Sequence, residues 1–81
     1  MPKLEVREDN PPSLEEAQKF VGGLVQMITL NNGDQLLMNE EGKLDDLPFN
    51  DEATKLWEHS FGKTDVIVGD ALLLKGKARW E

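Results

Sequence analysis

The chain has 81 residues and contains no cysteine. Without cysteine there is no disulfide and no metal site with thiolate ligands. The chain also has no run of 18 apolar residues and no basic segment leading into an apolar one. A membrane-spanning segment and a secretory signal are therefore not expected. A cytoplasmic location, with no membrane partner, is the expectation that follows.

The chain is also short, which predicts one domain over residues 1–81. A domain of this size buries only about 60–65% of the surface that its unfolded form exposes, so its stability is small. Small domains often gain stability from a disulfide, a metal or a partner subunit. Since the first is excluded, a homodimer or another protein partner is expected.

Basic residues are few beside acidic ones, and the net charge is −7. The acidic residues concentrate between Glu40 and Glu58, a segment that contains seven acidic residues and two lysines. Such a chain repels phosphate backbones, so direct binding to nucleic acid is not expected. The spacing around the glycines does not fit a calcium loop, so no metal site is expected. A solvated acidic face is the preferred interpretation.

Residues 1–12 read as a short N-terminal strand, at 3–7, followed by a proline-containing linker. The core is expected over residues 13–75 and begins with a helix. Ser13 and Glu16 have the spacing of a capping box. The helix ends at Gly22 and Gly23, and its apolar stripe comprises Leu14, Ala17, Phe20 and Val21.

Two strands, 24–30 and 34–38, are predicted to form a hairpin with a type I′ turn at Asn32 and Gly33. Apolar residues occur on both faces of this hairpin. Leu24, Ile28, Leu30, Leu36 and Met38 are assigned to one face, and Val25, Met27 and Leu37 to the other. One face is expected to cover the helices. The second face is a candidate for a partner, which makes Val25 and Met27 tentative interface residues.

The segment 39–50 is expected to reverse the chain at Gly42 and to place Leu44 and Leu47 in the core. Asn50 is the predicted N-cap of a second helix, which ends at Gly62. Residues 65–74 read as one bulged strand or two strands in a central position. Residues 76–81 are expected to form a tail or an edge strand. Trp80 there either lies against the sheet or anchors an interface.

These elements predict an α+β fold of order β-α-β-β-α-β. The expected architecture is a small antiparallel or mixed sheet with both helices packed on one face.

Four spaced elements carry a family resemblance. They are Val21-Gly22-Gly23, the run from Asn39 to Leu44, Leu47-Pro48 with Asn50, and the run from Asp65 to Gly69. In this order they resemble a family of small phage and bacterial proteins labelled domain of unknown function 3846. The resemblance implies an accessory protein of a phage or mobile element that acts in the cytoplasm of a bacterial host. It brings no catalytic residues with it.

In the segment 39–50, the residues Asn39, Glu41, Lys43 and Asn50 are tentative ligand-binding residues. Amide and ammonium groups on a rigid turn provide the few oriented contacts that a small-molecule site needs. The alternative interpretation is purely structural: a turn, two core leucines and a helix cap. No cofactor is expected. His59, the single histidine, has no nucleophile arrangement around it, so no enzymatic activity is expected.

Three hypotheses about function follow. The leading one is an accessory protein that acts by non-enzymatic protein binding or self-association. The second is a protein that binds or sequesters a small, nucleotide-like ligand through the residues around Lys43. The third is an acidic decoy that mimics nucleic acid, which requires the carboxylates of residues 40–58 to line one face.

Overall fold

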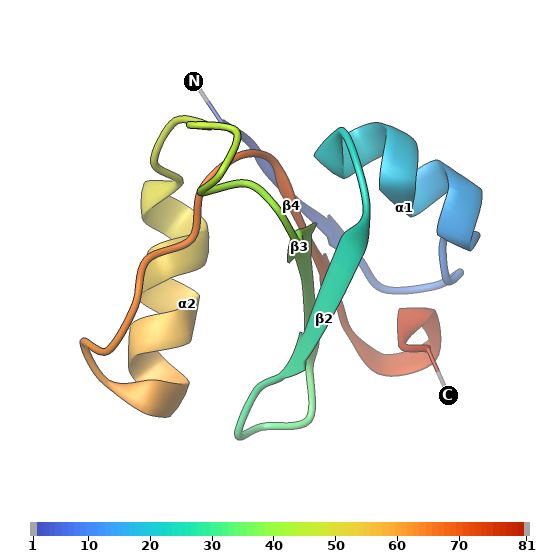
Figure 1. Ribbon diagram of the computed structural model, residues 1–81. Coiled ribbons are helices and arrows are strands. Elements are labelled where there is room, and N and C mark those ends of the chain that lie inside the picture. Colours follow the sequence, from blue (N-terminus) through green and yellow to red (C-terminus); the bar gives the residue numbers. More distant parts are fainter. Residues whose placement is uncertain (1, 81) are drawn as a thin grey trace.

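A four-stranded mixed sheet with one helix on each face forms the molecule in the computed structural model, which describes residues 2–80 (Figure 1). The predicted α+β class and the element order are confirmed. The elements are β1 (Leu4–Arg7), α1 (Leu14–Val21), β2 (Val25–Thr29), β3 (Gln35–Asn39), α2 (Asp51–Phe61), β4 (Ala71–Leu74) and a 3-10 turn (Gly76–Ala78).

The strand order across the sheet is β1-β4-β3-β2. β4 pairs in parallel with β1 and antiparallel with β3, and β3 pairs antiparallel with β2. The predicted central position of the segment 65–74 is confirmed for β4. Its earlier part is not a regular strand: Val68 makes an isolated bridge to Phe49, and Gly69 has a φ of +78°. The sheet is left with two edge strands, β1 and β2.

The prediction that both helices lie on one face is wrong. Along β3, Leu37 belongs to a core that includes Ala17 of α1, whereas Leu36 and Met38 belong to a core that includes Ala53 of α2. Figure 1 shows the two helices on opposite sides of the sheet. The physical reason is that β3 and β4 carry apolar residues at successive positions. Both faces of these strands must therefore be covered.

The helix α1 begins as predicted, with the Ser13 hydroxyl accepting from the Glu16 N–H at 3.0 Å. The reciprocal half of the capping box is not formed, because the Glu16 carboxylate binds Arg7 instead, at 2.7 Å. The helix ends at Gly22 with a φ of +83°, as predicted. Leu14, the first residue of the helix, was expected in the core but is exposed.

The hairpin between β2 and β3 is confirmed, but its turn is not type I′. Within the hairpin loop, Gly33 alone has a positive φ, +92°. The Gly33 N–H donates to the Leu30 carbonyl and the Leu30 N–H donates to the Asp34 carbonyl. This is a type I turn followed by a left-handed glycine, the usual three-residue hairpin loop. The loop therefore has three residues, 31–33, rather than the two of a type I′ turn.

The predicted N-cap of α2 is confirmed at Asn50, whose side-chain oxygen accepts from the Ala53 N–H at 3.0 Å. Asn50 is only 2% exposed. Its amide also donates to the carbonyls of Lys3 (3.0 Å) and Gly69 (2.8 Å). One side chain thus joins the start of α2 to the beginning of β1 and to the segment before β4.

The loop 40–49 differs from its prediction at Leu44, which is 84% exposed rather than buried. The loop turns outward there, and only Leu47 folds back. A Cβ atom at Gly42 would lie 2.9 Å from Val68 and 3.4 Å from Leu47. Glycine is therefore required at position 42 by close approach of two segments rather than by a left-handed backbone. No helix of residues 2–80 has the length and apolarity to cross a membrane.

Candidate functional site

Two regions of the surface contain residues that the sequence marks as functional. The first, called here the apolar face, comprises Phe20, Val25, Met27 and Trp80. Phe20, Val25 and Trp80 are half-buried against the core on the α1 side of the sheet. Met27 lies directly opposite Leu37 in the β2–β3 register, and Leu37 belongs to the same core. The structure therefore brings together all three predicted interface residues, Val25, Met27 and Trp80.

The tryptophan of the apolar face is held by its backbone and its ring. The Gln35 amide donates to the Trp80 carbonyl at 2.6 Å, and the Gln35 oxygen accepts from the Trp80 N–H. The ring Nε1–H donates to the Pro12 carbonyl at 2.8 Å. Residues 76–78 form a 3-10 turn rather than an edge strand. Trp80 thus lies against the sheet and is only partly buried there.

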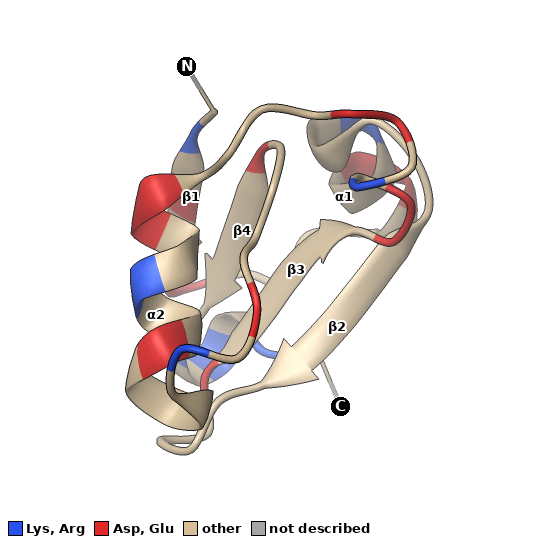
Figure 2. Ribbon diagram, turned by 60° about the vertical axis from the view of Figure 1, so that its left-hand side comes forward, with Lys and Arg blue, Asp and Glu red and all other residues tan. Residues whose placement is uncertain are grey.

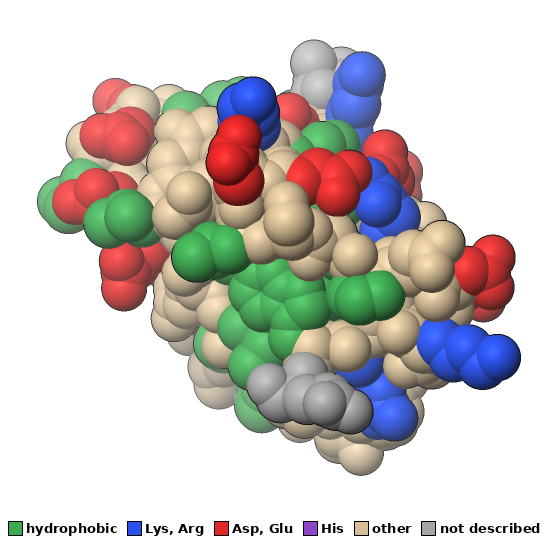
Figure 3. All heavy atoms as spheres, turned by 90° about the vertical axis from the view of Figure 1, so that its right-hand side faces the viewer, with side chains coloured by type: hydrophobic (Ala, Val, Ile, Leu, Met, Phe, Trp, Pro, Cys, Tyr) green, Lys and Arg blue, Asp and Glu red, His purple; other side chains and the backbone are tan. Residues whose placement is uncertain are grey.

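The short helix α1 leaves this side of the sheet incompletely covered. It has eight residues, and Met27 remains 43% exposed. Figure 3 shows hydrophobic side chains gathered on this side of the molecule, with acidic and basic side chains around them. An apolar centre with a charged surround is typical of a protein-binding surface.

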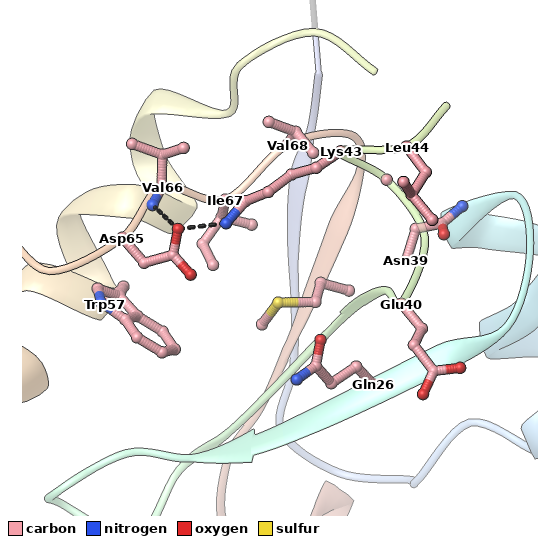
Figure 4. A pocket seen from close by; sticks show the side chains of 12 residues that line it. Gln26, Asn39, Glu40, Lys43, Leu44, Trp57, Asp65, Val66, Ile67 and Val68 are labelled. Atoms are coloured by element: carbon pink, nitrogen blue, oxygen red, sulfur yellow. Dashed lines mark hydrogen bonds and ion pairs between the residues drawn. The ribbon is translucent and has the colours of Figure 1, made fainter. Parts of the chain in front are cut away.

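The second region, called here the Lys43 pocket, lies on the α2 side between the loop after β3 and residues 65–68. It has a volume of about 150 Å³. Figure 4 shows Lys43 reaching toward Asp65, with Trp57 on one side of the hollow and Gln26 and Glu40 on the other. The lining residues are Gln26, Met38, Asn39, Glu40, Gly42, Lys43, Leu44, Trp57, Asp65, Val66, Ile67 and Val68.

Lys43 and Asp65 form an ion pair beside the pocket, and each side chain is about half exposed. The Asp65 carboxylate also accepts from the Val66 N–H at 2.8 Å. The hydrogen bond from Lys43, and then that from Val66, hold the pKa of Asp65 below its ordinary value. Asp65 is therefore an anion at neutral pH and neutralises the only lysine that lines the pocket.

The structure separates the four predicted ligand-binding residues. Asn39 and Lys43 line the pocket, whereas Glu41 and Asn50 do not. The Asn39 side chain is already used: its amide donates to the Val21 carbonyl, and its oxygen accepts from the Glu41 N–H. All three hydrogen bonds of Asn50 go to the backbone of the chain itself. Of the two that line the pocket, Lys43 has the charged side chain.

Two further pocket residues were not identified from the sequence. Trp57 is half-buried against the core on the α2 side, lines the pocket and contacts Phe61, with ring centroids 4.5 Å apart and the rings tilted by 47°. The other residue is Asp65, which pairs with Lys43 at a separation of 22 positions in the sequence. A contact at that separation leaves no spacing signal in the sequence. It depends on how the two loops fold.

The acidic residues of the segment 40–58 lie in two places. Four are in the loop after β3 and three are on α2, and Figure 2 shows these acidic groups apart, with basic residues beside them. Lys55 pairs with Asp51 at 3.2 Å on α2. Among residues 2–80, no group of three or more potential ligands converges on a metal position. The single acidic face that a nucleic-acid mimic needs is not formed.

Comparison with known proteins gives the family. A search of curated proteins and a search of solved structures found no match to this chain. A family model described as "Domain of unknown function (DUF3846)" matches residues 2–81. The resemblance seen in four sequence elements therefore extends over essentially the whole chain, and the protein belongs to the DUF3846 family.

Proposed function

We propose that the protein acts by non-enzymatic binding to another protein chain, and that the apolar face is the binding surface. The observation that carries this proposal is the convergence of Val25, Met27 and Trp80 on the incompletely covered side of the sheet. Aromatic residues and methionine are enriched where proteins bind each other. The family resemblance favours an accessory role in a phage or mobile element within its host.

The test compares two substitutions that each introduce one carboxylate at an exposed apolar residue. Met27→Glu places the charge in the apolar face, and Leu44→Glu places it on the outward loop of the other region. The wild type and both variants are used to capture partners. Any captured protein is identified and purified, and its binding to the wild type and to each variant is titrated. Binding that is lost with Met27→Glu and kept with Leu44→Glu supports the proposal. Equal binding by both variants contradicts it.

A second candidate function is the binding of a small, nucleotide-like ligand, and the cavity beside Lys43 favours it. Trp57 offers an aromatic surface and Lys43 a cation. Because Lys43 is paired with Asp65, a ligand phosphate must replace that carboxylate. The neighbouring Glu40 further opposes an anion. A nucleoside therefore suits this pocket better than its phosphates do.

Thermal unfolding with saturating nucleosides and nucleotides tests this second function. A ligand that binds the folded state raises the unfolding temperature. Lys43→Ala, which removes a side chain that lines the pocket, is expected to reduce the increase, whereas Lys55→Ala, which removes an ion-paired lysine on α2, leaves it intact. No increase at saturating concentrations of any of these compounds would contradict the function.

A further inference from the structure

The outer edge of β2 carries backbone groups that have no partner within residues 2–80. Hydrogen bonds from the Leu30 N–H to Asp34 and from the Glu40 N–H to Leu24 fix which residues of β2 point toward β3. By the alternation of an antiparallel ladder, Gln26 and Ile28 also point inward. The N–H and C=O groups of Val25, Met27 and Thr29 therefore point outward, where the sheet ends.

This edge also lacks the features that normally prevent edge strands from pairing. Proteins protect edges with charged residues, prolines or bulges. The stretch from Phe20 to Gly33 has 14 residues without a single charge or proline, in a chain with 31% charged residues. The ladder from β2 to β3 runs without a bulge from Val25 to Thr29. β2 is a regular, neutral and open template for another strand.

We propose that β2 pairs antiparallel with β2 of a second copy of this chain, so that two sheets become one. This pairing rests on the proposed protein-binding function, and it identifies a second copy of the chain as the partner of the apolar face. The register that uses every outward group places Met27 opposite Met27 of the second copy, and Val25 opposite Thr29 of the second copy. Each such pair exchanges two hydrogen bonds, which uses the outward groups of all three residues.

The side chains of this register favour pairing as well. A two-fold axis places the same surface of each copy against the other. The two Met27 side chains meet on the α1 side and extend the apolar face of one copy into that of the other. Residues 22–24 of one copy lie beside residues 30–32 of the second, and none of them is charged. Two molecules of net charge −7 thus meet along a neutral strip.

A partner of different sequence fits the same edge less specifically. Strand addition by an extended peptide would use the outward backbone groups, but no feature of β2 selects a peptide sequence. A second copy supplies an apolar residue opposite an apolar residue and a strand of matching length. The observations therefore favour self-association, and binding of a foreign peptide becomes an outcome of the test.

The test measures the mass of the protein in solution by sedimentation equilibrium, up to about 1 mM protein, the weak end of specific association. A dimer is expected. Met27→Pro removes the outward N–H and leaves the bonds to β3, so the dissociation constant should rise at least about tenfold. Val6→Pro is the matched control on the other edge and should leave the dimer unchanged.

Met27→Lys, which keeps the N–H group, is the second variant. It distinguishes a loss of association from a folding defect caused by proline. It places two like charges opposite each other in the dimer, so the dissociation constant should rise at least about fivefold. A wild-type monomer at every concentration would overturn the proposal, as would a dimer that survives both Met27 variants. A monomer that still binds another protein through Met27 would overturn it while leaving the proposed function in place.

Discussion

The two edges of the sheet are built in opposite ways. β1 is four residues long and carries Glu5 and Arg7, and Arg7 pairs with both Glu5 and Glu16 at 2.7 Å. β2 is five residues long and has no charged residue. Two prolines follow β1 at positions 11 and 12, whereas the stretch from Phe20 to Gly33 that contains β2 has none. The difference indicates that β1 is protected against pairing and that β2 is left open.

The backbone gives the same contrast. The Ala71 N–H donates to the Lys3 carbonyl, and the Lys75 N–H donates to the Arg7 carbonyl. By alternation in this parallel pair, only Leu4 and Val6 of β1 point outward, against three residues of β2. One edge of a small sheet can thus be closed by charge while the other serves association. The following predictions test that division.

The largest expected effect is at Asn50, which holds the beginning of β1. Asn50→Ala removes the cap of α2 and leaves the Gly69 carbonyl without its donor. We expect the free energy of unfolding to fall by about 2–4 kcal/mol. Urea denaturation measures the change. Asn50→Asp keeps the cap but turns a carboxylate oxygen toward the Lys3 and Gly69 carbonyls at a buried position, so it should lose at least as much stability as Asn50→Ala. An Asn50→Asp protein as stable as the wild type would contradict the role assigned to the amide.

A smaller effect is expected at Gln35, which fixes Trp80 beside the open edge. Gln35→Ala removes both hydrogen bonds to the Trp80 backbone. We expect a loss of about 1–2 kcal/mol in the free energy of unfolding, because these groups are partly buried. Trp80 fluorescence, read in a Trp57→Phe background, should shift to longer wavelength as the ring becomes exposed. An unchanged spectrum would show that Gln35 does not position this residue.

Removing the charges of β1 should make that edge resemble β2. The double substitution Glu5→Thr and Arg7→Thr breaks both exposed ion pairs, so the free energy of unfolding should change by only about 0–1 kcal/mol. Association is the informative measurement. In a Met27→Lys background, light scattering should detect new self-association through β1. A protein that stays monomeric would show that charge is not what closes this edge.

The smallest effect concerns the acid dependence of the β1 edge. The hydrogen bond from Arg7 holds the pKa of Glu16 below its ordinary value. The stabilisation is therefore present above the unfolded pKa of about 4.3 and is lost as the pH falls through the folded pKa. Glu16→Gln should reduce stability at neutral pH and have less effect in acid. Unfolding curves of the wild type and Glu16→Gln, measured at neutral pH and in acid, check this prediction. A difference in stability between the two proteins that does not shrink in acid would contradict it.

The sequence predicted the elements better than their arrangement. Ser13, Gly22 and Asn50 mark helix ends correctly because caps act within a few residues. The helices were assigned to one face because short apolar runs do not show which neighbours cover them. Leu44 was assigned to the core on hydrophobicity alone. Its exposure follows from the path of a loop that is set by contacts among Gly42, Leu47 and Val68.

The two candidate regions differ in how far the sequence could predict them. The apolar face was partly predictable, because alternation along β2 places Val25 and Met27 on one side. Only the position of Trp80 beside them needed the structure. The Lys43 pocket was not predictable, since it forms where residues 38–44 meet Trp57 and residues 65–68. Long-range contacts between loops decide such a site.

The most direct test of the division between the two edges is amide hydrogen exchange at different protein concentrations. The Met27 N–H points outward, and the N–H groups of Gln26 and Ile28 bond to β3. We predict that Met27 exchanges rapidly in dilute solution and slows as the concentration rises, while Val6 on β1 does not change. Exchange at Met27 that is independent of concentration, or slowing at Val6 instead, would contradict the account.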